Sequence, residues 1–454
     1  MAHHLAPSGY HKLIHRVNRF PPGVAPSELV LRIFALLFDE KDADLLAQLP
    51  LRPFTARQAA RAWKLSEGTA EELLEGFAER ALLLDGVHEG RRLYVFAPPM
   101  AGFFEFAMMR VRADVDQRAL AELLHSYVNE EDEFITRLFA GPPKLGRVLV
   151  HEPALPGSRA EGRAASAGGD GAAWPEGADD GGSAPDGLQI LDHELATEIV
   201  RQARHRAVGL CYCRHKMAHV GRACEAPQEM CLSLDFAADS LARHGHARAL
   251  DAPEAVALVE QAWDLGLVQF AENVRTSPKF ICNCCSCCCD AMLAARRLTF
   301  LHPVVSAGFL PVVNGSRCTG CGICLRACPV ASLSLVGAGD PWRPRAERAL
   351  VDPDTCLGCG VCVRSCRQGA LALTRRPERT LTPVNSAHRV VLQAIEHGTL
   401  ADLIFHQPGL ATHRALAAVL GAGLQLPPVK QALASRQLQS RYVEHIVDRR
   451  RWGY

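Results

Sequence analysis

Net charge is almost absent from this sequence, in which 50 lysines and arginines are balanced by 49 aspartates and glutamates to a formal net charge of +1. Such a balance gives no general attraction to nucleic acid or to an anionic membrane surface. Long hydrophobic runs are lacking as well. The apolar stretch from Leu29 to Phe38 is interrupted by Arg32 and is far shorter than the ~20 residues that span a bilayer. We therefore expect no membrane span, and nucleic acid is not an expected partner.

Motifs for organic cofactors and for export are also missing. The sequence contains neither a G-x-G-x-x-G dinucleotide fingerprint nor a Walker loop, so any flavin or pyridine nucleotide would belong to a partner protein. The first residues lack a basic region followed by an apolar stretch, and no twin-arginine signal precedes one. We expect a cytoplasmic location, because a reducing compartment keeps the thiolates of the 18 cysteines available to metal.

The length of 454 residues predicts two to four domains. Periodicity and turn residues favour a multidomain α+β fold that is mostly helical. We expect five segments, namely a helical domain with a hairpin (1–145), a linker (146–189), a cysteine-rich domain (190–308), a domain with two matched cysteine runs (309–376) and a helical tail (377–454).

The first hundred residues predict helices followed by a β-hairpin. The expected elements are a helix from Ser27 to Leu49, a helix from Thr55 to Leu65, a helix from Ser66 or Thr69 to Leu83, and a hairpin from Asp85 to Phe96. This order is typical of a winged helix, which usually binds DNA. The third of these helices is rich in glutamate, however, and DNA phosphates would repel it. The arginines of the hairpin, Arg91 and Arg92, are the best support for DNA binding.

Two segments outside these domains have biased composition. Residues 152–188 are rich in alanine, glycine and acid and have almost no bulky side chains, so we expect a disordered linker there. The tail predicts helices over 386–396, 412–424 and 429–447, and it ends in a small basic and aromatic patch. Docking of that patch to acidic helices is the favoured interpretation.

Eight cysteines form the most specific pattern, two runs with the same C-x2-C-x2-C-x3-C spacing. They are Cys318, Cys321, Cys324 and Cys328, followed by Cys356, Cys359, Cys362 and Cys366. A [4Fe-4S] cube needs four thiolates from different directions, and a tight loop with a cysteine at every third position supplies three. Glycines in both loops permit close wrapping of the backbone. The runs therefore predict two [4Fe-4S] clusters, with two zinc sites as the alternative.

Residues 312–374 resemble a bacterial two-cluster ferredoxin domain, including Pro329 after the first run. The resemblance implies a small βαβ-like fold in which the last cysteine of each run binds the other cluster. The implied ligand sets are Cys318, Cys321, Cys324 and Cys366 for one cluster, and Cys356, Cys359, Cys362 and Cys328 for the other. Arg367 stands where the family usually has proline, and a cation there would raise the potential of the adjacent cluster. The insertion from Val336 to Leu350 is expected to cover one cluster.

Ten further cysteines lie upstream in two groups that match no common zinc or ferredoxin spacing. The first group is Cys211, Cys213, Cys224 and Cys231, and the second is Cys282, Cys284, Cys285, Cys287, Cys288 and Cys289. If the second group is extended, Cys285, Cys287 and Cys289 share one face of a strand, and the other three lie on the opposite face. Helices over 238–244 and 253–266 would bring the two groups together.

Residues 190–375, with their C-x-C-R and N-C-C-x-C-C-C patterns, resemble a little-characterised group of prokaryotic iron-sulfur proteins. The resemblance implies a cofactor class and no particular reaction. One or two further iron-sulfur centres are expected, and zinc or redox-active thiols remain open alternatives. His215 and His219, four residues apart on a predicted helix, favour zinc. Arg214 and His215 either place a cation beside a cluster, which would raise its potential, or form a surface or salt-bridged pair. For His205, His219, His244 and His246 a surface position is expected.

These patterns predict an electron-transfer protein that carries two [4Fe-4S] clusters and further metal centres. It would exchange electrons with a redox partner protein. Two alternatives stay open. One is a cluster-responsive winged-helix regulator, and the other is a reductase whose catalytic site lies among the upstream cysteines.

Overall fold

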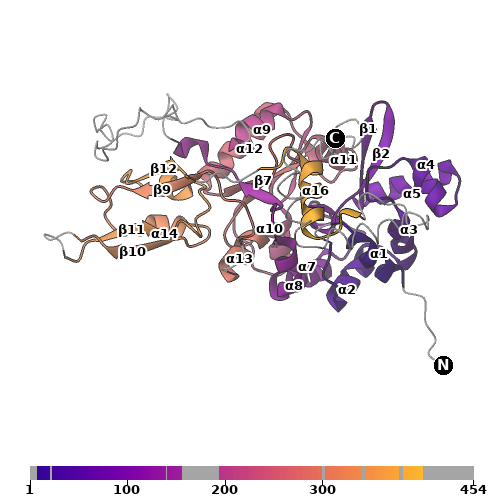
Figure 1. Ribbon diagram of the computed structural model, residues 1–454, viewed down its shortest axis with the longest axis horizontal. Coiled ribbons are helices and arrows are strands. Elements are labelled where there is room, and N and C mark those ends of the chain that lie inside the picture. The colour runs from indigo at the N-terminus through magenta and orange to yellow at the C-terminus, as the bar shows by residue number, and fades with distance from the viewer. Residues whose placement is uncertain are drawn as a thin grey trace.

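The structure is a computed structural model that describes residues 8–20, 23–139, 141–155, 194–298, 302–339, 344–377 and 382–401. Helices of the N-terminal region lie at one end of its longest axis, a six-stranded sheet lies in the middle, and two pairs of strands extend at the other end (Figure 1). The content is thus a mixture of helices and small sheets. Most of the expected linker and the tail helices over 412–424 and 429–447 lie outside the described residues.

The N-terminal region is mainly helical. Its elements are α1 (Gly9–Val17), α2 (Glu28–Leu37), α3 (Glu40–Gln48), α4 (Ala56–Trp63), α5 (Glu67–Glu79), β1 (Leu83–His88), β2 (Arg91–Phe96), η1 (Pro99–Phe103), α6 (Phe104–Phe106), α7 (Gln117–His125), η2 (Ser126–Glu130) and α8 (Asp132–Phe139). Thr55 and Ser66 are the N-caps of α4 and α5, and β1 pairs with β2 in an antiparallel hairpin. Two helices therefore precede a hairpin.

The single helix expected from Ser27 to Leu49 is wrong, because the structure divides it into α2 and α3. Phe38 adopts an extended conformation with φ −162°. Asp39 then accepts a hydrogen bond from the Asp42 backbone N–H and begins a new helix. Apolar residues continue across this break at helical spacing, so periodicity alone could not locate it.

The middle region contains an antiparallel sheet in the order β3-β7-β8-β5-β4-β6. Its strands are β3 (Gly146–Val148), β4 (Arg206–Leu210), β5 (Glu229–Leu234), β6 (Arg248–Ala249), β7 (Val268–Glu272) and β8 (Phe280–Cys284). The associated helices are η3 (Glu152–Ala154), α9 (Ala196–Gln202), α10 (Tyr212–His219), α11 (Asp235–Arg243), α12 (Ala252–Asp264) and α13 (Asp290–Arg297). Val208, Leu232 and Ile281 from three adjacent strands pack with Val259 and Trp263 of α12.

The two expected helices between the cysteine groups correspond to α11 and α12, but the sheet beside them was not expected. Its strands are short, and β7 is buried at every position, so it shows no alternation of polar and apolar residues. The first residues of the expected linker also belong to this sheet, since Gly146–Val148 pairs with β7 as β3.

The two matched cysteine runs lie among four strands and two short helices. These are β9 (Phe309–Val313), α14 (Ile323–Ala327), β10 (Leu333–Gly337), β11 (Glu347–Val351), α15 (Val361–Ser365) and β12 (Leu371–Arg375). β9 pairs with β12, and β10 pairs with β11. Helix α16 (Ser386–Glu396) follows and lies against β7, where Arg389 forms an ion pair of 3.0 Å with Glu272.

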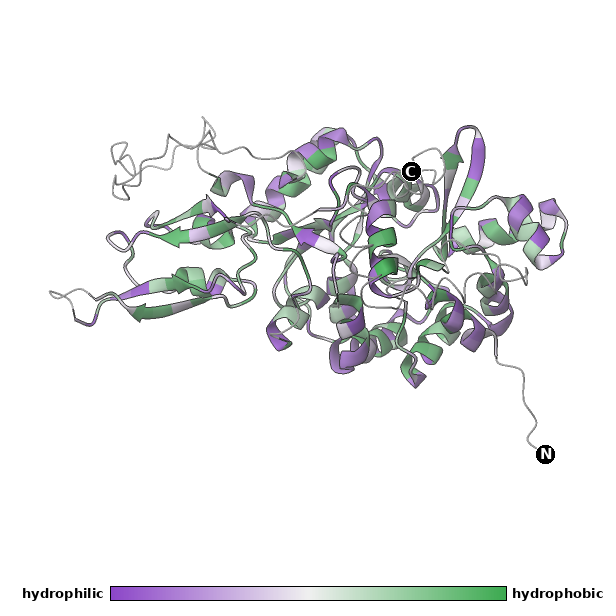
Figure 2. Ribbon diagram, viewed as in Figure 1, coloured by the Kyte–Doolittle hydropathy of each residue, from purple (hydrophilic) through white to green (hydrophobic). Residues whose placement is uncertain are grey.

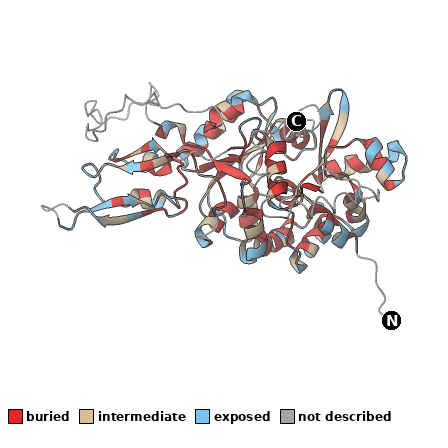
Figure 3. Cartoon of the chain, in the orientation of Figure 1, coloured by how far each residue is buried: buried red, intermediate tan, exposed pale blue. Residues whose placement is uncertain are grey.

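Burial and hydropathy follow this arrangement. Buried residues concentrate in the middle region and become sparse toward the ends of the paired strands β9 to β12 (Figure 3). Many helices carry a hydrophobic and a hydrophilic side (Figure 2), as expected of helices with one buried face. Among the described residues, no helix is both long enough and apolar enough to cross a membrane.

Candidate metal centres

Glycine sets the shape of both loops in the matched cysteine runs. Gly322 (φ 69°) and Gly360 (φ 85°) precede α14 and α15 in the left-handed conformation. A Cβ atom at Gly358 would lie 2.2 Å from the carbonyl oxygen of Phe309, and one at Gly320 would lie 2.6 Å from that of Glu347. The loops therefore need glycine both for backbone conformation and for close packing.

The folded loops bring the eight cysteines around two cavities. Cys318, Cys321, Cys324 and Cys366 line the first, together with Leu335 and Ala349 of β10 and β11. Cys328, Cys356, Cys359 and Cys362 line the second. Each cavity takes three cysteines from one run and the last cysteine from the other. Ala349 belongs to the insertion from Val336 to Leu350 that was expected to cover one cluster, whereas Leu335 precedes that insertion.

The two cavities differ in their shielding from solvent. Burial raises the pKa of Cys359 to about 12, and it also raises the pKa of Cys356 and Cys362. Cys321 in the first cavity is exposed, and a hydrogen bond from the Ile323 backbone N–H lowers its pKa. Because metal binds the thiolate form, it must displace the protons of the buried cysteines. Arg367 is exposed.

Four upstream cysteines form a compact group, which we call the four-cysteine group. The thiols of Cys224, Cys285, Cys287 and Cys288 all lie within 4.8 Å of one another. The Sγ atoms of Cys224 and Cys285 are 3.6 Å apart, and those of Cys287 and Cys288 are 3.8 Å apart. A tetrahedral ion with metal–sulfur bonds of ~2.3 Å separates its sulfurs by about 3.8 Å. The spacing fits one ion, since a cube with iron at its corners holds its cysteines farther apart.

The expected alternation along an extended second group is wrong. Strand β8 ends at Cys284, a turn follows over residues 285–288, and Cys289 precedes α13. Cys285 and Cys288, expected on opposite faces, therefore lie in the same group. Cys289, expected beside Cys285 and Cys287, is absent from the four-cysteine group.

The other six upstream cysteines line one cavity of about 240 Å³, which Cys285 also lines, and we call these six the six-cysteine group. Its members are Cys211, Cys213, Cys231, Cys282, Cys284 and Cys289. Cys231 lies on β5, and Cys282 and Cys284 lie on β8. Hydrogen bonds link the thiols in series from Cys213 through Cys289, Cys284 and Cys282 to Cys231. The hydrogen bond with Cys289, followed by burial, raises the pKa of Cys213 well above its usual value.

Arg214 lies between the two groups. Its side chain is fully buried, so the expectation of a surface position is wrong. The guanidinium donates hydrogen bonds to the carbonyl oxygens of Pro227 and Asn283. Burial would lower its pKa, but the thiolate charges of Cys211 and Cys285 outweigh burial and raise it. One fixed cation thus faces a member of each cysteine group.

A second buried cation, missed from the sequence, lies beside the six-cysteine group. Lys216 is fully buried and donates hydrogen bonds of 2.6 Å to Asp290 Oδ1 and Asn129 Oδ1. It also lies over the Tyr212 ring, 5.4 Å from the centroid. Lys216 is on α10 three residues after Cys213, and Asp290 directly follows Cys289. The ion pair therefore joins the elements that carry these two cysteines.

The histidines of this region do not join the cysteines. His215 pairs with His219 at 3.2 Å between their Nε2 atoms, and its Nδ1 lies 2.7 Å from the Met108 carbonyl oxygen. The expected surface position is wrong for His246, which is 1% exposed and contacts the Glu79 carbonyl oxygen. His244 is half-buried at 2.9 Å from Asp85. Of the four histidines expected at the surface, His205, His219, His244 and His246, only His205 is exposed.

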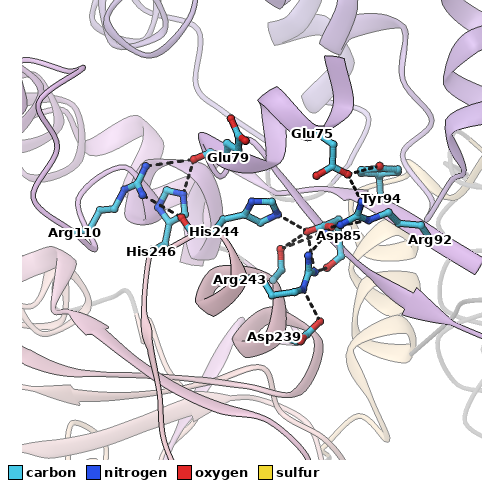
Figure 4. Close-up of polar contacts among 11 residues, drawn as sticks. Glu75, Glu79, Asp85, Arg92, Tyr94, Arg110, Asp239, Arg243, His244 and His246 are labelled. Atoms are coloured by element: carbon cyan, nitrogen blue, oxygen red, sulfur yellow. Dashed lines mark hydrogen bonds and ion pairs between the residues drawn. The ribbon is translucent and has the colours of Figure 1, made fainter. Parts of the chain in front are cut away.

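A carboxylate cluster joins the hairpin β1–β2 to α11 (Figure 4). Asp85 accepts hydrogen bonds from Arg92, Arg243, His244 and Ser240. Burial would raise the pKa of Asp85, but the hydrogen bonds of His244 and Arg243 and the charge of Arg243 hold it well below its usual range. Glu75, Asp85 and His244 are close enough to hold a metal ion. Arg92 and Arg243 already neutralise the Asp85 carboxylate, so the role of Asp85 is structural.

His151 connects the sheet to the second cavity of the matched cysteine runs, which Cys359 lines. Its backbone N–H donates to the Cys359 carbonyl oxygen at 2.9 Å, and its Nε2 lies 2.6 Å from the Leu267 carbonyl oxygen. Leu267 packs in a small apolar cluster that includes Cys285 of the four-cysteine group. An ion pair of 2.9 Å between Arg364 and Asp264 lies at the same junction. No sequence motif marks His151.

The comparisons with known proteins agree with the geometry of the matched runs. No curated protein and no solved structure matches the chain. Residues 317–370 match the family model described as a 4Fe-4S dicluster domain. The prediction of a 4Fe-4S domain is thereby confirmed, and with the upstream cysteine groups it indicates an iron-sulfur electron-transfer protein.

Proposed function

We propose that this protein carries electrons between a redox partner and an iron-sulfur centre held by the six-cysteine group. The observation that carries the proposal is the gathering of all 18 cysteines at four sites, two in the dicluster domain and two upstream, where Cys285 of the four-cysteine group also lines the cavity of the six-cysteine group. In the dicluster domain, we assign Cys318, Cys321, Cys324 and Cys366 to one cluster. Cys356, Cys359, Cys362 and Cys328 would bind the other. When bound, such clusters supply one-electron transfer.

The four-cysteine group would bind a single zinc ion with a structural role. Its sulfur spacing supports one tetrahedral ion, and four thiolates are a common structural zinc set. The ion would close the turn over residues 285–288. Cys284 and Cys289 of the six-cysteine group lie on either side of this turn. The zinc alternative raised by the sequence is therefore placed on cysteines, without His215 or His219.

The six-cysteine group would bind a polynuclear iron-sulfur centre. Six cysteines around one cavity exceed the four ligands of one cube, and the site is buried between α10, β5, β8 and α13. Arg214 would raise the potential of this centre by stabilising the more negative reduced state.

The partner would dock where the first dicluster site meets solvent, at exposed Cys321. A DNA-binding regulator is less well supported. Arg92 of the hairpin is bound to Asp85 and Glu75, and β1 packs on α11. Helix α5 also carries the glutamates that DNA phosphates would repel.

Metal analysis of the anaerobically purified protein tests the two upstream centres. We expect one zinc ion per chain and more than the about eight irons that two cubes contain. Cys287→Ser should remove zinc and leave the iron of the dicluster domain, whereas Cys213→Ser should remove only iron in excess of about eight. Ser286→Ala, in the same turn, is the matched control and should change neither metal.

Two outcomes would contradict the proposal. An iron content of no more than about eight with intact upstream cysteines would remove the six-cysteine centre. If the protein contained iron and no zinc, and Cys287→Ser and Cys213→Ser lost equal amounts of that iron, the two groups would share one cluster and would not form two separate centres.

A further inference from the structure

Arginine dominates the charge of the dicluster domain. Residues 317–370 contain seven arginines and no lysine, against four acidic residues. The whole chain, by contrast, has a formal net charge of only +1. A local excess of one sign raises the electrostatic potential of the surface that carries it. The positions and partners of these arginines therefore indicate what such a surface attracts.

Three arginines in or next to this domain have partners within the chain. Arg364 forms an ion pair of 2.9 Å with Asp264, and Arg375 forms one of 3.0 Å with Glu194. Arg376 donates hydrogen bonds to three backbone carbonyl oxygens. The guanidinium groups of these three residues are therefore already engaged inside the molecule.

Four other arginines are exposed and have no such partner. They are Arg317, Arg326, Arg348 and Arg367, and we call them the four-arginine surface. In the part of the chain that the structure describes, their guanidinium groups form no hydrogen bond and no ion pair. These four charges are therefore available to the carboxylates of another molecule.

The four-arginine surface lies beside the first dicluster site. Three of its members directly precede or follow a residue that lines this cavity. Arg326 Nη1 lies 3.5 Å from where a Cβ atom at Gly322 would be, and Arg317 Nη1 lies 4.0 Å from the corresponding position at Gly369. Cys321, which lines the same cavity, is itself exposed. The four charges thus lie next to the point where this site meets solvent.

Charge and position together identify what this surface binds. Arginine pairs with carboxylates through two parallel hydrogen bonds, which favours a partner rich in aspartate and glutamate. One exposed acid, Glu347, lies next to Arg348 in the sequence, so the surface stays positive overall. Nucleic acid also attracts arginine, but it brings no electron to a cluster. A positive surface beside an electron-transfer site therefore fits an acidic redox protein best.

We propose that the four-arginine surface docks an acidic electron-carrier protein whose own redox centre faces the first dicluster site. The inference rests on the proposed function and names the partner of that same site. One electron passes from the reduced centre of the carrier to the cluster beside Cys321, so the carrier is oxidised and the cluster is reduced. No bond forms or breaks in this step. Complementary charge speeds the encounter, and a small contact lets the carrier leave after the transfer.

The test is calorimetric binding of oxidised plant-type [2Fe-2S] ferredoxin, a small acidic carrier, to the full-length protein purified without oxygen. We expect binding at about 20 mM salt that weakens at least tenfold at about 300 mM, because salt screens exposed charges. Arg317→Glu/Arg367→Glu should weaken binding at least about tenfold at the lower salt concentration, because two attractive charges become repulsive. Arg317→Lys/Arg367→Lys keeps both charges and should stay within about threefold of the wild type.

Arg32→Glu/Arg61→Glu is the matched control. Both residues are exposed and lie on α2 and α4, in the N-terminal region at the other end of the longest axis from β9 to β12 (Figure 1). The net charge of the chain changes by the same amount as in Arg317→Glu/Arg367→Glu. The affinity for ferredoxin should nevertheless stay within about twofold of the wild type, because screening limits the reach of distant charges.

Three results would overturn the docking surface. They are absence of ferredoxin binding at the lower salt concentration, equal loss of affinity in the two charge-reversal variants, and tighter binding of a double-stranded oligonucleotide than of ferredoxin. Iron analysis of the same samples separates these results from failure of the proposed function. A protein with more than about eight irons that does not bind ferredoxin keeps its upstream centre and loses only this partner. Unchanged iron in the variants shows that their clusters are intact.

Discussion

Buried cations distinguish this site at the scale of single residues. Arg214 has no carboxylate among its hydrogen-bond partners, which are the carbonyl oxygens of Pro227 and Asn283. Its charge is therefore left to interact with the thiolates of Cys211 and Cys285. Lys216, by contrast, is neutralised by Asp290 at 2.6 Å. Of these two cations, Arg214 is the one placed to tune a metal centre.

Replacing Arg214 with methionine should lower the midpoint potential of the six-cysteine centre. Loss of a buried positive charge removes a preference for the reduced, more negative state. A decrease of at least about 59 mV is expected, which is a tenfold change in a one-electron equilibrium. Redox titration followed by electron paramagnetic resonance measures the change.

Arg214→Lys separates charge from structure in that experiment. Lysine keeps the charge and cannot reproduce both carbonyl contacts, so recovery of the potential would show that charge is responsible. A potential that falls equally in both variants would assign Arg214 a purely structural role. Arg222→Met, at an exposed position shortly after α10, should have little effect.

Sequence reasoning was most successful for residues whose partners are close along the chain. Three of the four cysteines proposed for each dicluster site lie within seven residues, so spacing alone predicts them. The pairing of Cys224 with Cys285 spans 61 residues and depends on how β5 and β8 are placed. The C-x-C-R pattern singles out Arg214 but not its burial. His151 carries no motif, because its role comes from burial and from backbone contacts that only the folded sheet creates.

At the scale of elements, the hairpin β1–β2 is fixed to α11 by one carboxylate. Asp85 is fully buried, and both Arg243 and His244 reach it from the end of α11. The Ser240 hydroxyl links it to the same helix at 2.9 Å. The Asp85 backbone N–H also donates to Ser240. A hairpin held this way is part of the middle region and is not a free DNA-binding wing.

Asp85→Asn should release the hairpin. Removing one partner of a buried ion pair costs about 3 kcal/mol, because the remaining charges lose their counter-charge. Faster hydrogen–deuterium exchange of residues 83–96 at pH 7 is the expected result. Asp239→Asn is the control, since Asp239 contacts the same Arg243 at 3.2 Å in a more exposed position and should cost less than about 1 kcal/mol.

The effect of Asp85→Asn should depend on pH in one direction. The folded-state pKa of Asp85 lies below its ordinary value of 3.8, so the carboxylate stabilises the fold fully above that value. This stabilisation is lost as the pH falls toward the folded-state pKa. The difference in exchange between wild type and variant should therefore be largest near neutral pH and shrink below about pH 4. A difference that grows on acidification would contradict this account.

In the whole molecule, the second dicluster site lies next to the six-stranded sheet. His151 bonds to the Cys359 carbonyl oxygen on one side and to the Leu267 carbonyl oxygen on the other. The more exposed first site, with Cys321, lies in the same domain. The first dicluster site thus meets solvent at Cys321, and the second lies next to the sheet that carries upstream cysteines.

His151→Ala should slow reduction of the upstream centre while leaving both dicluster sites assembled. The substitution removes a buried ring that fills the junction, and none of the 18 cysteines is altered. Freeze-quenched samples taken after mixing with dithionite should show early reduction of the dicluster signals and delayed reduction of the upstream signal. Equal delays in wild type and variant would show that electrons reach the upstream centre by another route.

The turn over residues 285–288 has a consequence for biogenesis. Cys284 and Cys289 flank it and belong to one group, while Cys285, Cys287 and Cys288 within it belong to the other. In the proposed assignment, closing the turn on a small ion would fix the separation of Cys284 and Cys289. We therefore expect loading of this ion to precede assembly of the iron-sulfur centre of the six-cysteine group.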